Sequence, residues 1–151
     1  MIAYLDCAGG LAGNMLLGAL LDAGAPEAEL RAVPERLGIQ PVELRLERVW
    51  RHGIGALHLD VIAGPPQPER SWRSIQQQLS AADLDEPVRE RAGAVFARLA
   101  EAEGQIHGVP PDDVHFHELG AVDTLIDVVG AVTLLDGLGV SHMACSPLPM
   151  G

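Results

Sequence analysis

Two histidines and three carboxylates fall within thirteen residues in the last third of the chain. The stretch opens with His115-Phe116-His117-Glu118 and continues to Asp123 and Asp127. If residues 115–117 are extended, both imidazoles point to one face, because side chains alternate along a strand. If residues 120–137 form a helix, Asp123 and Asp127 lie one turn apart and share a face. The spacing therefore predicts a cluster of metal-binding side chains.

The predicted helix 120–137 is hydrophobic nearly all round, and this pattern predicts that the helix is buried. Carboxylates on a buried helix cost free energy unless a positive charge meets them. Neither Lys nor Arg occurs between Arg98 and Gly151. A metal ion, nearby imidazolium groups or a partner chain must therefore neutralise Asp123 and Asp127.

Imidazole suits nickel, zinc, copper and iron, and carboxylates can complete the ligand set. We predict that the metal ligands include His115, His117, Glu118 and Asp127, and that Glu118 and Asp123 also act in catalysis. Two structural alternatives remain open. Either histidine could be a hydrogen-bonded core residue, and His117 with Glu118 could form a surface pair.

Glu103 and His107 form a second candidate metal site near the end of a predicted helix over residues 85–107. They are four residues apart, so they share a helix face. The structural alternative for His107 is a favourable position near the negative end of the helix dipole. The alternative for Glu103 is a solvated surface position.

The segment from Asp6 to Asn14 reads as a strand end, a glycine-rich turn and a helix start. Backbone N–H groups at such a turn can hold a phosphate or carboxylate. The segment matches neither common phosphate-binding glycine motif, so a tight turn that needs small residues is the alternative. Asp6, at the end of the strand, is a candidate catalytic residue. The candidate cofactor-binding residues are Gly9, Gly10, Gly13 and Asn14.

Composition narrows the class of protein. The chain has 151 residues, which predicts a single domain over residues 1–151. Its formal net charge of -11 argues against binding to nucleic acid or to an anionic membrane surface. Two cysteines, Cys7 and Cys145, form no metal-binding pair motif. No signal peptide and no apolar run of about 20 residues is visible, so we expect a cytoplasmic protein.

The hydrophobic pattern predicts an α+β fold, with a small mixed sheet of about four strands and helices packed on it. Residues 2–5 read as a buried strand, and residues 42–61 as a hairpin of two half-buried strands. Residues 143–146 read as a last strand. Helices are expected over residues 15–23, with Asn14 as N-cap, and over 26–37, 71–80, 85–107 and 120–137. Ser71 is the predicted cap of helix 71–80, and Gly108 is predicted to end helix 85–107. His52-Gly53-Ile54-Gly55 are predicted to connect the two strands of the hairpin.

Several of these segments together resemble the nickel-insertion proteins of the LarC type. The resemblance spans essentially the whole chain, and its most specific part is the long motif around His115-Phe116-His117-Glu118. The matching segments are Asp6-Cys7 with Gly10, Gly13 and Met15, then residues 17–24, 100–103, 107–108, 114–123, 126–130 and 146–149.

The resemblance implies a function and a larger protein. Proteins of this family insert nickel into pyridinium-3,5-bisthiocarboxylic acid mononucleotide, forming nickel–sulfur and nickel–carbon bonds while CTP is consumed. The product is the nickel-pincer cofactor of lactate racemase and related enzymes. The chain resembles only the N-terminal portion, so CTP with a divalent metal is expected in the C-terminal part that is absent here.

The chain departs from the family pattern at three places. Asn14 stands where the family usually has Asp, and Ala8-Gly9 stand where it has Phe-Ser. Residues 64–69 stand where family members often carry a histidine-rich stretch. A metal-binding role for position 14 and a nickel-storing segment are therefore not expected.

We interpret the chain as the N-terminal domain of a nickel chelatase, a lyase whose substrates are nickel and a nucleotide-derived small molecule. One alternative is a metal-dependent hydrolase, because the same side chains suit zinc with an activated water. Another is a non-catalytic oligomerisation or scaffold domain whose carboxylates pair with a neighbouring copy. A homo-oligomer is compatible with each of these functions.

Overall fold

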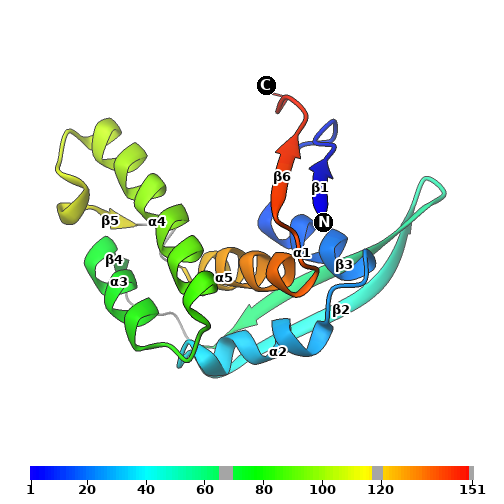
Figure 1. The fold of residues 1–151 in the computed structure, drawn as a ribbon, viewed down its shortest axis with the longest axis horizontal. Helices are drawn as coiled ribbons and strands as arrows, with labels where there is room; N and C mark the ends of the chain where they lie inside the picture. Colours follow the sequence, from blue (N-terminus) through cyan, green and yellow to red (C-terminus); the bar gives the residue numbers. More distant parts are fainter. Residues whose placement is uncertain (65–69, 117–120, 150–151) are drawn as a thin grey trace.

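Helix α5 (Val122–Gly137) lies at the centre of the fold and packs against α1, α2, α4 and β3 (Figure 1). The computed structural model describes residues 1–64, 70–116 and 121–149. Leu125, Ile126 and Val129 are fully buried on α5. The predicted burial of this helix is confirmed, because its apolar side chains face neighbours on several sides.

The chain begins with strand β1 (Ile2–Leu5), followed by helices α1 (Gly13–Asp22) and α2 (Glu27–Arg36). Helix α1 starts before the predicted residue 15, and Ala12 occupies the N-cap position without a side-chain cap. The prediction of Asn14 as N-cap is therefore wrong. Asn14 lies in the first turn, where its Nδ2 donates to the Leu59 carbonyl oxygen at 3.4 Å and ties α1 to the neighbouring strand.

Strands β2 (Val42–Arg51) and β3 (Ile54–Ala63) form the predicted antiparallel hairpin. They are joined by His52 and Gly53, which both have positive φ, as two-residue hairpin turns of this kind require. Figure 1 shows that the end of the hairpin with this turn extends beyond the helices. Strand β3 packs against α1 and α5, and its central residue Leu59 is fully buried.

A second group of elements follows the hairpin. Strand β4 (Arg70–Ser71) leads into helix α3 (Trp72–Ala81), and the predicted cap is confirmed, because Ser71 Oγ accepts a hydrogen bond from Ser74 N at 3.1 Å. Helix α4 (Glu86–His107) is next, and Gly108 is its C-cap in the left-handed conformation. The short 3-10 helix η1 (Pro111–Asp113) then leads to strand β5 (His115–Phe116), which pairs with β4.

The α+β class is confirmed, but the strands of the described residues do not join into one sheet. They form three two-stranded sheets, β1–β6, β2–β3 and β4–β5, where β6 is the final strand (His142–Cys145). Helices α1 and α5 separate the β1–β6 pair from the hairpin (Figure 1). The expectation that residues 2–5 are buried is also wrong, because Ile2 and Tyr4 are 75% and 66% exposed. Among the described residues, β1 pairs with β6 alone.

Candidate functional site

The glycine-rich loop connects the carboxyl end of β1 to α1. Asp6 Oδ1 accepts a hydrogen bond from Ala8 N at 3.2 Å, and Gly10 N donates to the Cys7 carbonyl oxygen at 2.9 Å. Cys7 itself is 1% exposed. The loop is therefore a series of tight turns, and such turns alone would explain why its residues are small. The first turn of α1, which follows the loop, contains no acidic side chain.

A second segment supports this loop. Ser146, directly after β6, accepts a hydrogen bond through its Oγ from Cys7 N at 2.8 Å, and Ser146 N donates to the Leu5 carbonyl oxygen at 2.9 Å. Sequence reasoning did not place Ser146 at the loop. The available signal was weak, since it consisted only of a hydroxyl directly after a predicted strand.

Asp127 lies against the start of α1. A Cβ built on Gly13 would lie 2.1 Å from Asp127 Oδ2 and 2.5 Å from its Cβ, so only glycine fits beside this carboxylate. The contact joins a predicted metal ligand on α5 to a predicted cofactor-binding residue of the glycine-rich loop. Gly13 was identified from the sequence, but its contact with Asp127 was not, because the two residues are far apart in the chain.

The carboxylate of Asp127 is poorly satisfied by the protein. Its Oδ1 is buried and has no hydrogen-bond partner among the described residues. Burial, and secondly the negative charge of Asp123, raise the pKa of Asp127 to about 6. A buried carboxylate oxygen without a donor is costly unless a proton, a cation or a ligand group meets it.

Asp123 is one turn before Asp127 and, contrary to expectation, is exposed. Its Oδ1 accepts a hydrogen bond from Thr124 N at 2.8 Å in the first turn of α5. An acidic residue is favourable there because the helix dipole is positive at its N-terminal end. Asp123 is therefore solvated and accepts a backbone hydrogen bond, and its charge acts on Asp127.

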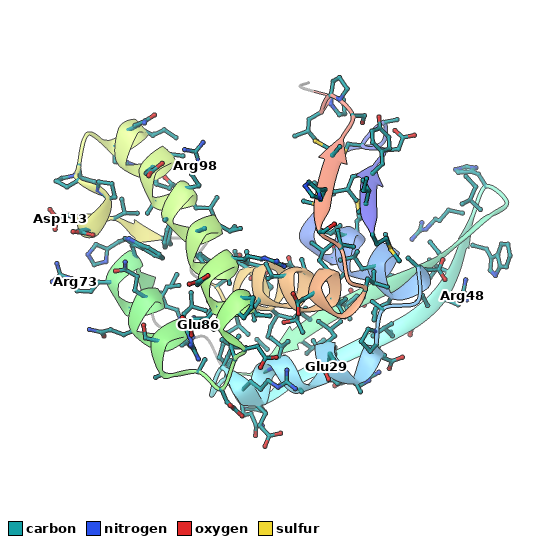
Figure 2. The ribbon with its side chains drawn as sticks, in the orientation of Figure 1. Glu29, Arg48, Arg73, Glu86, Arg98 and Asp113 are labelled. Atoms are coloured by element: carbon teal, nitrogen blue, oxygen red, sulfur yellow. The ribbon has the colours of Figure 1, made fainter. Side chains whose placement is uncertain are left out.

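The arginines in the figure lie away from this contact. Figure 2 shows Arg48 on the hairpin, Arg73 on α3 and Arg98 on α4, whereas α1 and α5 meet in the middle of the molecule. Arg48 pairs with Asp22 at 2.6 Å, and Arg98 pairs with Glu101 at 3.3 Å. The labelled arginines thus do not neutralise Asp127.

The histidine motif is only partly described. His115 is exposed on β5 opposite Ser71, and Phe116 is 1% exposed in the core. His117 and Glu118 lie outside the described residues. Among the residues that are described, no three His, Cys, Asp or Glu side chains lie close enough together to hold a metal ion. The convergence of the two imidazoles with the carboxylates stays a prediction.

Glu103 and His107 do face each other, as their spacing predicted. His107 Nε2 lies 3.2 Å from Glu103 Oε2 near the C-terminal end of α4. Figure 1 shows that end of α4 and the loop between β1 and α1 on opposite sides of the molecule. This pair is therefore separate from the contact between Gly13 and Asp127.

The comparison with protein families agrees with the sequence motifs. The family model described as "Nickel insertion protein" matches residues 3–151. The chain belongs to the nickel insertion protein family. A relative from Thermomicrobium roseum that is named for nickel insertion is 48% identical over 150 residues, which cover 99% of this chain and 37% of that protein.

A second relative has a more specific name. The pyridinium-3,5-bisthiocarboxylic acid mononucleotide nickel insertion protein of Nocardioides sp. is 44% identical over 149 residues, covering 99% of this chain and 38% of the relative. The chain thus spans less than two-fifths of the length of these relatives. No solved structure matches the chain. None of the described helices has the length and hydropathy needed to cross a membrane.

Proposed function

We propose that this chain holds nickel and an anionic mononucleotide for nickel insertion into pyridinium-3,5-bisthiocarboxylic acid mononucleotide. The observation that carries the proposal is the buried, unpartnered Oδ1 of Asp127 beside the start of α1. Membership of the nickel insertion family and the name of the Nocardioides relative support the choice of metal and substrate. Nickel is a substrate in this reaction.

We assign nickel binding to His115, His117, Glu118 and Asp127. Imidazole and carboxylate ligands suit a divalent ion of this kind. Because the pKa of Asp127 is raised to about 6, its proton is readily exchanged for a cation near neutral pH. Binding nickel at this carboxylate would relieve the cost of its burial, which neither an arginine nor a backbone donor relieves among the described residues.

The phosphate of the mononucleotide is assigned to the glycine-rich loop, with Gly9, Gly10, Gly13 and Asn14 around it. The first turn of α1 has no side-chain cap and no acidic residue of its own, so its backbone N–H groups and helix dipole favour an anion. Nickel bound at the neighbouring Asp127 would offset the negative charge of that carboxylate. The side-chain Nδ2 of Asn14 already donates a hydrogen bond to the Leu59 carbonyl oxygen. Backbone groups would therefore contribute most of the binding.

Formation of a nickel–carbon bond replaces a proton on the ring carbon, so a base must accept that proton. We assign this task to Glu118, Asp6 or Asp123. Asp6 belongs to the glycine-rich loop, Glu118 precedes α5 in the sequence, and Asp123 lies in the first turn of α5. Asp6 and Asp123 are both exposed and accessible to a ligand. Glu103 and His107 would form a separate nickel-binding position on α4.

Further parts of the proposal concern the longer protein. We propose that residues 1–151 form one N-terminal domain, and that CTP with a divalent metal binds in the part that the relatives have beyond the match. The complete protein would be a cytoplasmic lyase that supplies the cofactor of lactate racemase-type enzymes. It could act as a homo-oligomer.

Isothermal titration calorimetry with nickel tests the metal assignment. The variants are Asp127→Asn and the double variant His115→Ala/His117→Ala. We expect each to weaken nickel binding at least about tenfold, which is about 1.4 kcal/mol. The matched control is His52→Ala/His58→Ala, which removes two exposed histidines of the hairpin. Equal affinity in the wild type and both site variants would contradict the assignment.

The same variants separate the two alternative functions. A zinc-dependent hydrolase would turn over phosphate or amide esters with zinc in this chain alone, and would lose that turnover in His115→Ala/His117→Ala. A scaffold domain would form a tight oligomer whose thermal stability does not respond to nickel or zinc.

A further inference from the structure

The pair of strands β1 and β6 is unusual because it is parallel and almost completely exposed. Residues 2–5 pair with residues 142–145 in parallel register. All four residues of β6 are exposed, and two of the four residues of β1 are exposed as well. Parallel sheets in proteins are almost always covered on both faces. The β1–β6 pair departs from this rule, since most of its residues are exposed.

The side chains of this pair also lack the features that protect a natural sheet edge. Strands exposed at an edge usually carry charged residues, proline or bulges, which prevent pairing with other chains. The two strands read IAYL and HMAC, without a charged residue or a proline. Ile2, Tyr4 and Met143 are 75%, 66% and 54% exposed. The β2–β3 hairpin differs, since Glu43, Arg45 and Glu47 point into solvent along its first strand.

We propose that the β1–β6 pair is part of a larger parallel sheet, completed by strands from the region of the longer family proteins that has no counterpart in this chain. More than half of the length of each relative lies outside the match, which is ample for further strands. Additional parallel strands need long crossover connections, so they come from a substantial segment of chain.

A second copy of this chain is a poorer occupant. Each copy has a net charge of -11, so two copies repel each other. Pairing of two β1–β6 edges would also leave their apolar faces uncovered unless helices came with them. A segment with crossover helices covers both the edges and the faces.

The proposal places the added segment beside the candidate site, although it does not depend on nickel binding. The carboxyl ends of β1 and β6 lead into the glycine-rich loop and into Ser146, which are joined by the hydrogen bond from Cys7 N. In open sheets of parallel strands, ligands bind beyond the carboxyl ends of the strands. Loops from the added strands would therefore lie next to the glycine-rich loop.

Hydrogen exchange tests the proposal with two proteins as they exist: this chain and the full-length Thermomicrobium roseum relative. In the relative, we expect amides at the positions matching residues 2–5 and 142–145 to exchange about 100-fold more slowly than in this chain, since they become part of a buried sheet. Amides of the exposed hairpin end around Trp50 are the internal control and should differ little. Equally fast exchange in both proteins would overturn the proposal.

A substitution gives a second, independent readout. Tyr4→Glu should leave the melting temperature of this chain nearly unchanged, because Tyr4 is exposed, but should lower that of the full-length relative at the matching position. Trp50→Glu, at a side chain that is 71% exposed on the hairpin, is the matched control and should affect neither protein. An equal response to Tyr4→Glu in both proteins would count against the added sheet. A dimer of this chain whose formation protects residues 2–5 would assign the edge to a second copy and overturn the proposal.

Discussion

At the scale of single residues, the contact between Gly13 and Asp127 carries most of the functional argument. The absence of a side chain at Gly13 lets the carboxylate lie directly against the start of α1. The carboxylate has one buried oxygen without a partner among the described residues and a pKa raised to about 6. Such an arrangement lowers the stability of the fold. Losses of stability of this kind are common at sites that bind ligands or catalyse reactions.

The close approach at Gly13 predicts the effect of a single methyl group. Gly13→Ala places a Cβ 2.1 Å from Asp127 Oδ2, so α1 or the carboxylate must move. We expect the free energy of unfolding to fall by about 1–3 kcal/mol, measured by urea denaturation. The matched control is Gly93→Ala in α4, where a Cβ meets nothing within 4 Å. This control should gain about 0.5–1 kcal/mol from helix propensity, and a similar gain for Gly13→Ala would contradict the packing described here.

The pKa of Asp127 predicts a pH-dependent effect on stability. Its pKa is raised from 3.8 to about 6 in the folded chain. Between these values the folded chain holds a proton that the unfolded chain has released, so stability falls as the pH rises through this window and stays lower above it.

The variant Asp127→Asn cannot acquire that charge. Its melting temperature should exceed that of the wild type at pH 7.5 and approach it below about pH 4. Thermal unfolding followed by circular dichroism at several pH values checks this. The control is Asp112→Asn, which removes an exposed carboxylate from η1 and should show no such gain. A constant difference across the pH range would argue against ionisation of Asp127 as the cause.

At the scale of elements, β5 contains one buried and one exposed residue of the histidine motif. Phe116 is fully buried, whereas His115 beside it is exposed. We expect Phe116→Ala to cost about 3–5 kcal/mol of unfolding free energy. His115→Ala should stay within about 0.5 kcal/mol of the wild type. Urea denaturation of both variants is the measurement, and equal losses would mean that His115 has a packing role.

The elements also show where sequence patterns are reliable. The Ser71 cap, the end of α4 at Gly108 and the hairpin turn were each predicted correctly, because capping and turn chemistry depend on residues only a few positions apart. The start of α1 was missed. Its first turn is held by contacts with β3 and α5, whereas the local signal at Asn14 indicated a later start.

At the scale of the whole molecule, the charge balance affects stability. The net charge is -11, while the ion pairs among the described residues are mostly at the surface. Surface pairs contribute little, and salt screens both these pairs and the overall repulsion. Because repulsion is the larger effect at this charge, we expect added salt to stabilise the fold.

A salt titration tests this balance. The melting temperature should rise between about 20 mM and about 300 mM NaCl, where the screening length becomes shorter than the molecule. Glu90→Gln, which removes one exposed negative charge from α4, should raise the melting temperature at low salt and reduce its salt dependence. A melting temperature that falls with salt would show that the surface ion pairs outweigh the repulsion.

The sequence alone determined the helices, the hairpin, the burial of α5 and the membership of a nickel insertion family. It also identified Gly13 and Asp127 as candidate site residues. These properties are contained in local periodicity, in capping residues and in motifs that can be read along the chain. The family assignment needs no coordinates, because it depends on residue types in order.

Only the tertiary structure decided which of these residues meet. It placed Asp127 against Gly13, left Asp123 in solvent and put the pair of Glu103 and His107 on another side of the molecule. It also paired β1 with β6 and kept the strands in separate sheets. The physical reason is that such contacts join segments separated by many residues. They are selected by packing of the whole chain around α5, which no local pattern encodes.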